Sequence, residues 1–339
     1  MNLKQCDNFI GSCASWDEFY EEASKMDNKN KGDAFERLTQ LYLKTCPEYA
    51  SILKEVWWQG ENLPKNLQNK LALPDQDEGI DLIAETYTGE YWAIQCKFRT
   101  DQSKALTYKE LSTFSALSFV TCNNISLALV VHTTTKPVKK RELLPDMTEV
   151  GLDRWLDLSN EDWKRITSQC KYKKLKLEKR KPRPHQKEAI QDAKKHFVLE
   201  KHSRGKLIMP CGTGKSLTAF WIAEALEAKT IVVAVPSLAL VRQSLSDWTR
   251  EFLAHGIIPS WYCFCSDEST GKLDADEFVG STYDLGIPAD TSKDKIEKFL
   301  KNSEKPKIEG DYWEEFINID HENHTNSTQA LNIDGQFAF

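Results

Sequence analysis

One ten-residue segment constrains the fold more than any other part of the chain: residues 207–216, LIMPCGTGKS. A strand is predicted at 206–210, and a helix is expected to begin at Lys215. Glycine-rich turns between a strand and a helix let backbone N–H groups wrap a phosphate, while Lys neutralises its charge and Ser ligates Mg²⁺. The segment therefore predicts a phosphate-binding loop with five contributing residues: Gly212, Thr213, Gly214, Lys215 and Ser216.

The surrounding pattern predicts a parallel α/β sheet. A second strand is expected at 230–235, and helices are expected after Lys215 and at 238–252. This βαβα order is typical of parallel strands with helices on both faces of the sheet.

The first half of the chain predicts a separate α/β unit. Helical spacing runs over 17–45, with Phe35, Leu38, Leu41 and Tyr42 on one face after a break at 31–33. Strands at 80–86 and 91–99, joined through Gly89, predict a β-hairpin. A helix at 108–120 and a buried strand at 125–132 complete the unit, which is expected to end near 137–141.

The hairpin carries the first candidate site. Alternation over 91–98 puts Gln95 and Lys97 on the face opposite a core face of Trp92, Ile94, Cys96 and Phe98. Buried polar side chains need partners, and the predicted partner is Asp81.

The hairpin register decides whether Asp81 reaches that face. An odd-length loop centred on Gly89, or a bulge, brings Asp81 opposite Lys97, whereas a two-residue turn at Thr88 and Gly89 would pair it with Cys96. A simple cross-strand ion pair between Asp81 and Lys97 is the alternative to a functional site.

Composition limits the class of protein. With 339 residues, 40% of them hydrophobic and 28% charged, the chain predicts two folded domains. A net charge of -6 excludes a globally basic nucleic-acid coat. Nine scattered cysteines without paired metal-ligand spacing predict reduced thiols and no structural zinc. Because neither a signal peptide nor a membrane span is present, we expect a cytoplasmic protein without membrane contact.

Basic residues gather in one segment. From Lys164 to Lys187 there are eleven Lys or Arg and one acidic residue, Glu178. Two interpretations of this connector remain open: a solvated linker, and a surface that contacts DNA phosphates.

Asp81 followed by Gln95-Cys96-Lys97 resembles the PD-(D/E)xK nuclease signature in its QxK form, as in Mrr-like restriction domains. Glu36 matches the glutamate that these domains often carry on their first helix. The resemblance implies an αβββαβ restriction-endonuclease-like core in which Asp81 and position 95 hold Mg²⁺ and Lys97 orients water and stabilises charge. Gln95 replaces the commoner acid, which favours one metal ion over two.

The phosphate loop resembles that of superfamily 2 helicases, in which a residue such as Met209 stands where the general pattern has glycine. Residues 183–190 resemble the Q motif, which implies that Arg183 and Gln186 lie at the adenine of ATP. Residues 233–241 resemble motif Ia, which implies a phosphate contact with DNA. The three motifs imply a partial RecA-like domain that binds ATP and Mg²⁺.

The run from Asp81 to Leu300 resembles the front end of type ISP restriction-modification enzymes. We therefore predict a nuclease domain at 1–160, a basic connector at 161–182, a partial helicase domain at 183–300 and an irregular tail at 301–339. No DExH box follows: residues 319–324 have the right residue types in a scrambled order.

The resemblance implies an Mg²⁺-dependent endonuclease fused to an ATP-binding translocase or helicase module of a bacterial restriction-modification (phage defence) system. Its partner is double-stranded DNA. The chain is expected to end before the DExH box, and methyltransferase and target-recognition domains are expected to be missing or on another chain. Two other functions remain open: a DNA repair helicase with a structural N-terminal domain, and a catalytically dead DNA-binding adaptor.

Overall fold

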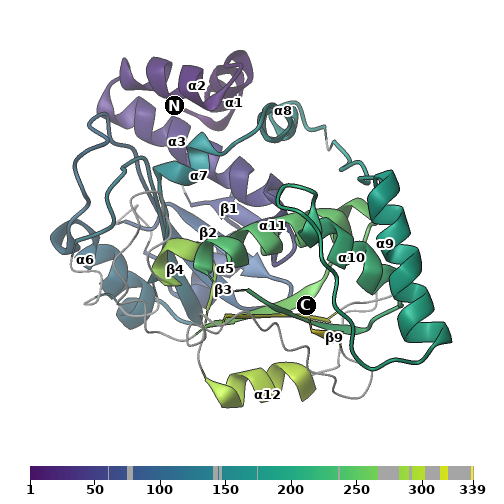
Figure 1. The fold of residues 1–339 in the computed structure, drawn as a ribbon. Coiled ribbons are helices and arrows are strands. Elements are labelled where there is room, and N and C mark those ends of the chain that lie inside the picture. The colour runs from purple at the N-terminus through teal and green to yellow at the C-terminus, as the bar shows by residue number, and fades with distance from the viewer. Residues whose placement is uncertain are drawn as a thin grey trace. The chain divides into compact units, whose positions relative to one another are not determined.

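The computed structural model describes the chain except for residues 60, 75–78, 140–143, 145–146, 174, 236, 266–281, 290–291, 302–313, 320–336 and 339. The chain divides into two compact units. The first unit comprises Met1–Leu175 with Tyr283–Pro288, and the second comprises Lys176–Thr282 with Ala289–Phe339. Both units are α/β, as predicted (Figure 1).

The first unit is built on a five-stranded sheet with the strands in chain order. The strands are β1 Leu53–Trp58, β2 Leu82–Thr86, β3 Tyr91–Lys97, β4 Ile125–His132 and β5 Met147–Val150. The pairs β1–β2 and β2–β3 are antiparallel, and β3–β4 and β4–β5 are parallel. With α3 before β1 and α6 between β3 and β4, the predicted αβββαβ order is confirmed.

The helices of the first unit are α1 Leu3–Ser12, α2 Trp16–Ser24, α3 Asn28–Thr45, α4 Pro47–Ala50, α5 Lys65–Leu71, α6 Tyr108–Ala116 with the π-helical turn η1 Leu117–Thr121, α7 Leu152–Leu156 and α8 Asn160–Gln169. The helical spacing predicted over 17–45 is confirmed as two helices, but the break between them lies at residues 25–27 instead of 31–33. Asp27 separates α2 from α3, because its side chain caps α3 by accepting from the N–H groups of Lys29 and Asn30. Gly32, the expected break, lies inside α3.

Both faces of this sheet are buried. On one face α3 packs against β1 and β3, and the Trp155 ring lies 5.0 Å from Trp16 and 4.9 Å from Tyr42. On the other face Phe114 of α6 belongs to a core cluster with Ile83, Ala93 and Val130. The prediction of a single core face on β3 is therefore incomplete, because the crossover helix α6 covers the second face.

The first unit also extends past residue 160. Trp163 and Ile166 of α8 are buried, and the Trp163 indole donates to the carbonyl of Cys13 at 2.8 Å. Nine residues of the predicted connector, 161–169, thus belong to a packed helix, and the unit ends at Leu175.

The second unit contains α9 Pro184–Lys194 with the π-helical turn η3 Lys195–Leu199, α10 Lys215–Ala225, α11 Leu238–Ala254 and α12 Lys293–Lys301. Its strands β6 Thr230–Ala234, β7 Ser260–Cys265, β8 Glu314–Ile319 and β9 Phe337–Ala338 form a sheet in the order β7-β8-β6-β9, with parallel pairs. The predicted parallel sheet is confirmed. None of the described helices is long and apolar enough to cross a membrane.

The predicted strand at 206–210 is wrong. These residues have no strand conformation, and Leu207 and Ile208 are 47% and 80% exposed. A strand needs a neighbouring backbone to pair with, and none of the described strands pairs with this segment. Of the predicted irregular tail, the structure describes Lys301 at the end of α12, β8 and β9; residues 320–324 of the scrambled DExH-like segment lie outside the described residues.

Candidate functional site

The loop of the β2–β3 hairpin has three residues, Tyr87 to Gly89. Thr86 N–H donates to the carbonyl of Glu90 at 2.9 Å, and Gly89 N–H donates to that of Thr86 at 3.1 Å. Gly89 has a φ of +83°, which favours glycine at this turn position. The expected odd-length loop is confirmed, but its centre is Thr88 instead of Gly89.

Asp81 is positioned by a bulge. Its N–H donates to the carbonyl of Ile94 at 2.9 Å, although the register partner of Ile94 is Leu82. Ile80 and Ile83 also share one core cluster, so the alternation of faces breaks between them. The predicted pairing of Asp81 directly with Lys97 is therefore wrong, because the loop centre and the bulge place Asp81 beside Ile94.

The Asp81 carboxylate nevertheless meets the QxK segment. Its Oδ2 accepts from the backbone N–H of Cys96 at 2.5 Å, and the side chain is buried. Burial raises the pKa of the Cys96 thiol well above its usual range, the carboxylates of Asp81 and Glu36 raise it further, and Lys97 lowers it. The three charged groups of the predicted site therefore lie near the same thiol.

Glu36 comes from α3, and its Oε2 accepts from the Trp58 indole N–H at 2.7 Å. Trp58 is the last residue of β1 and the register partner of Leu82, the neighbour of Asp81. This hydrogen bond fixes one oxygen of Glu36 at the end of the sheet where Asp81 lies.

Gln95 carries a buried oxygen that no described residue satisfies. The residue is 3% exposed, and its Oε1 has no hydrogen-bond partner. A Cβ at Gly79 would lie 3.3 Å from Gln95 Nε2, so the amide is closely surrounded. An unsatisfied buried oxygen is costly, and hard cations such as Mg²⁺ take oxygen ligands. Asp81 and Gln95 fit the donor set of such a cation.

Lys97 forms no ion pair with any described residue, which argues against the simple ion pair with Asp81. Its neighbour in the parallel ladder is His132, the last residue of β4. His132 is buried; its Nε2 lies 3.1 Å from Glu149 Oε2, and its Nδ1 is 3.2 Å from the Thr134 N–H. Since the Thr134 N–H needs an acceptor, Nδ1 is unprotonated and Nε2–H donates to Glu149.

The pair His132 and Glu149 is not among the residues predicted from the sequence. The available signal was the position of His132 at the carboxyl end of the strand predicted at 125–132, after the helix predicted at 108–120.

The phosphate loop enters α10 as predicted, with Gly214 as its N-cap residue. Gly212 and Gly214 have φ values of +76° and +82°, so both positions favour glycine. Lys215 is exposed at the first position of the helix. The Ser216 hydroxyl accepts from the Trp248 indole N–H at 3.1 Å, which orients the candidate Mg²⁺ ligand.

Gln186 lies against the loop. Its Nε2 donates to the carbonyls of Thr213 at 3.2 Å and Gly214 at 3.3 Å, and its Oε1 accepts from the Arg183 N–H at 2.8 Å. A Cβ at Gly214 would lie 2.8 Å from Gln186 Nε2. The residue assigned by resemblance to adenine thus holds the loop backbone in this structure, and its adenine contact stays a prediction.

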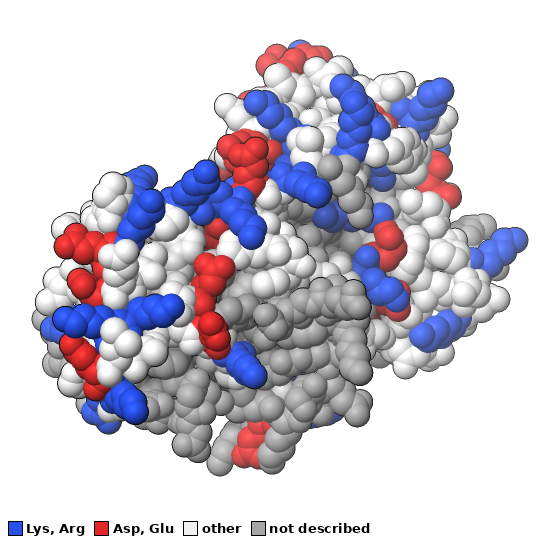
Figure 2. Space-filling view, turned by 90° about the vertical axis from the view of Figure 1, so that its right-hand side faces the viewer, with Lys and Arg blue, Asp and Glu red and all other residues white. Residues whose placement is uncertain are grey.

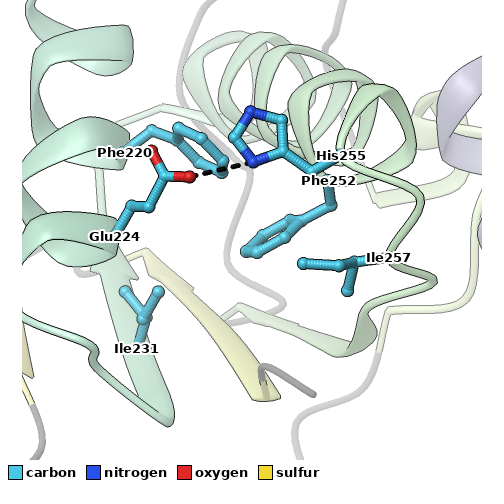
Figure 3. Close-up of a pocket in the computed structure, with 6 residues that line it drawn as sticks. All are labelled: Phe220, Glu224, Ile231, Phe252, His255 and Ile257. Atoms are coloured by element: carbon cyan, nitrogen blue, oxygen red, sulfur yellow. Dashed lines mark ion pairs between the residues drawn. The ribbon is translucent and has the colours of Figure 1, made fainter. Parts of the chain in front are cut away.

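One pocket of the second unit is lined by Phe220, Glu224, Ile231, Phe252, His255 and Ile257 (Figure 3). His255 Nδ1 and Glu224 Oε1 form an ion pair of 2.9 Å across it. Phe220 and Glu224 lie in the C-terminal half of α10, whereas the phosphate loop precedes its first residue. The pocket is therefore separate from the nucleotide site.

Charge on the visible face is mixed. Figure 2 shows Lys and Arg side chains interspersed with Asp and Glu. This agrees with the net charge of -6 and leaves the connector as the strongest local concentration of basic residues in the sequence.

Two parts of the chain match known families. Residues 44–180 match a family of Mrr-type restriction endonucleases, and residues 179–277 match the res subunit of type III restriction enzymes. A solved structure of the ATP-dependent type ISP restriction-modification enzyme LlaBIII bound to DNA is 25% identical, with a TM-score of 0.66 over 90% of this chain. The chain spans 18% of the length of that enzyme. No protein with a curated function matches.

Proposed function

We propose that this chain, a restriction-endonuclease domain joined to a helicase-like domain, cleaves double-stranded DNA with Mg²⁺ and binds ATP. The observation that carries the proposal is the unsatisfied, buried Oε1 of Gln95 in the segment that the Asp81 carboxylate contacts. Its similarity to part of a type ISP enzyme supports the choice of DNA as substrate.

Each nuclease residue has a distinct task in this proposal. Asp81 and Gln95 hold the cation, which supplies Lewis-acid stabilisation of the attacked phosphodiester when bound. Lys97 orients the attacking water and stabilises the charge that develops on the phosphate. Glu36 adds negative charge near Asp81, and the Trp58 indole fixes its position.

The helicase-like domain is proposed to hold ATP and, in a longer enzyme, to move DNA. Gly212 and Gly214 shape the loop, Lys215 neutralises phosphate charge, and Ser216 ligates Mg²⁺. We propose that residues 1–339 cut DNA without sequence specificity and act in the cytoplasm. The connector is the surface proposed to contact DNA phosphates.

The side chain at position 95 tests the nuclease proposal directly. Gln95→Leu removes the buried oxygen and is expected to raise the Mg²⁺ concentration that half-saturates plasmid nicking by about tenfold, as lost metal-site contacts do. Gln95→Glu adds a charged ligand and is expected to lower that concentration. Nicking of supercoiled DNA, titrated with Mg²⁺ and stopped by chelator, is the measurement.

The other candidate functions make a different prediction for this assay. A dead adaptor or a repair helicase with a structural N-terminal domain shows no Mg²⁺-dependent nicking. If the Mg²⁺ concentration that half-saturates nicking is the same for wild type, Gln95→Leu and Gln95→Glu, Gln95 is not a ligand of the metal.

Lys215→Ala tests the nucleotide site. The variant is expected to bind Mg-ATP about 10- to 100-fold more weakly, because one charge-assisted contact contributes about 1.5 to 3 kcal/mol. Titration with a fluorescent ATP analogue measures this affinity, and Lys229→Ala, which removes an exposed lysine elsewhere in the unit, is the control.

Phosphate release by wild type is expected to equal that of Lys215→Ala. DNA-stimulated turnover that depends on Lys215 would mean that the chain holds a hydrolytic carboxylate, with Asp320 and Glu322 the first candidates.

A further inference from the structure

A six-residue segment, Tyr283–Pro288, belongs to the first unit, although the chain on both sides of it belongs to the second unit. Leu285 is fully buried, and Ile287 is 2% exposed. The chain therefore passes between the two units three times, and this segment, called the strap below, packs on the nuclease domain as a peptide ligand would.

The strap is bound largely through its backbone. Three side chains of the first unit each donate to one of its carbonyl groups: Thr148 to Tyr283 at 2.7 Å, Arg154 to Leu285 at 3.0 Å, and Tyr49 to Gly286 at 2.8 Å. Arg154 is itself buried and paired with Glu48 at 3.1 Å. A buried guanidinium needs its partners, and the strap supplies one of them through the carbonyl of Leu285.

Gly286 makes the fit specific. Its φ is +70°, and a Cβ there would lie 2.5 Å from Tyr49 Oη and 3.0 Å from Val150 Cγ2. A residue larger than glycine would therefore clash with the nuclease domain where the strap contacts β5. Matched pockets of this kind select one peptide over others.

The residues of β5 that contact the strap are linked to Lys97 through β4. β5 contacts the strap through Thr148 and Val150, and Glu149 between them accepts from His132. His132 is the ladder neighbour of Lys97, and the Thr133 hydroxyl donates to the carbonyl of Arg99 at 3.0 Å, just after β3. A displacement of β5 would therefore move His132 through its hydrogen bond with Glu149, and β4 would then move the backbone that carries Lys97.

We propose that the strap is an intramolecular ligand of the nuclease domain and that its seating on Tyr49, Thr148 and Arg154 sets the position of Lys97. Strands and side chains that depend on a docked peptide lose order when it leaves. The chemical task of Lys97 rests on the proposed function, whereas its position does not.

Gly286→Ala in the full chain is the test. The added methyl is expected to unseat the strap and to raise the hydrogen-exchange rates of residues 147–150 by about tenfold or more, as local opening does. The rate at which an amine-acylating reagent labels Lys97, read by mass spectrometry, is expected to change by about threefold or more with that opening. Gly256→Ala is the matched control, because Gly256 also has a positive φ, +78°, but nothing lies within 4 Å of an added Cβ.

Tyr49→Phe combined with Gly286→Ala checks that the cause is the docking contact. Removing the hydroxyl relieves the closest clash, so the double variant is expected to recover part of the protection and part of the Lys97 labelling rate. Tyr49→Phe alone loses one hydrogen bond and is expected to give a smaller effect in the same direction. Wild-type exchange at 147–150 in Gly286→Ala would show that the strap does not dock. Faster exchange with an unchanged Lys97 rate would show that docking does not set its position. Neither readout depends on DNA cleavage, so a failure of the nuclease proposal is seen separately.

Discussion

Replacing Asp81 by Asn is expected to reduce Mg²⁺-dependent nicking by about 10³-fold or more. The substitution keeps the size of the side chain and removes the charged ligand of the proposed cation. A bound metal ion supplies several kcal/mol of transition-state stabilisation, and each 1.4 kcal/mol corresponds to about tenfold in rate. Single-turnover nicking of supercoiled plasmid measures the loss.

DNA binding provides the control for this variant. The basic connector is unchanged in Asp81→Asn, so its affinity for duplex DNA is expected to equal that of wild type and to fall steeply with salt, as phosphate contacts require. Unchanged nicking in Asp81→Asn would place the metal elsewhere. An affinity for duplex DNA that does not change with salt concentration would show that the connector does not contact DNA phosphates.

Replacing Lys97 by Ala is expected to reduce the nicking rate by about 10²- to 10³-fold, the usual cost of removing one group that stabilises transition-state charge. Unlike the change at Asp81, it removes no metal ligand. The Mg²⁺ concentration at half-saturation is therefore expected to stay at the wild-type value while the maximal rate falls. Mg²⁺ titration of nicking at saturating enzyme separates the two effects.

Lys54→Ala is the matched control for Lys97→Ala. Lys54 lies in β1 of the same sheet, 57% exposed and paired with Glu85, and exposed ion pairs contribute little to stability. A loss of nicking in Lys54→Ala equal to that in Lys97→Ala would point to a general effect of charge instead of a role for Lys97.

That Asp81, Gln95 and Lys97 lie near one another was predicted from the sequence better than the hairpin register was. Strand alternation placed Gln95 and Lys97 on one face, and the requirement for an odd-length loop or a bulge was met by both. The exact register of the β2–β3 hairpin could not be predicted. The three-residue loop and the bulge at Asp81 depend on local backbone geometry, which the alternation of polar and apolar residues does not encode.

Two errors have the same physical origin. The segment 206–210 has the composition of a strand but no described pairing partner, and the break expected at 31–33 lies inside α3 because Asp27 caps that helix upstream. Local composition favours an element, and hydrogen-bond partners and caps decide where it forms. The return of residues 283–288 to the first unit could not be predicted either, since it depends on Tyr49, Thr148 and Arg154, which lie more than a hundred positions away.

The position of the strap in the sequence also determines when the first unit can complete its folding during translation. Residues 1–175 leave the ribosome first, but Tyr283 follows only after the 107 residues from 176 to 282. At translation rates of about 5 to 20 residues per second, the delay is about 5 to 20 seconds. During that interval the Arg154–Glu48 pair lacks the carbonyl of Leu285, and Thr148 and Val150 of β5 lack their contacts with the strap. A nascent polypeptide that stops before residue 283 therefore carries Asp81, Gln95 and Lys97 on an unfinished domain.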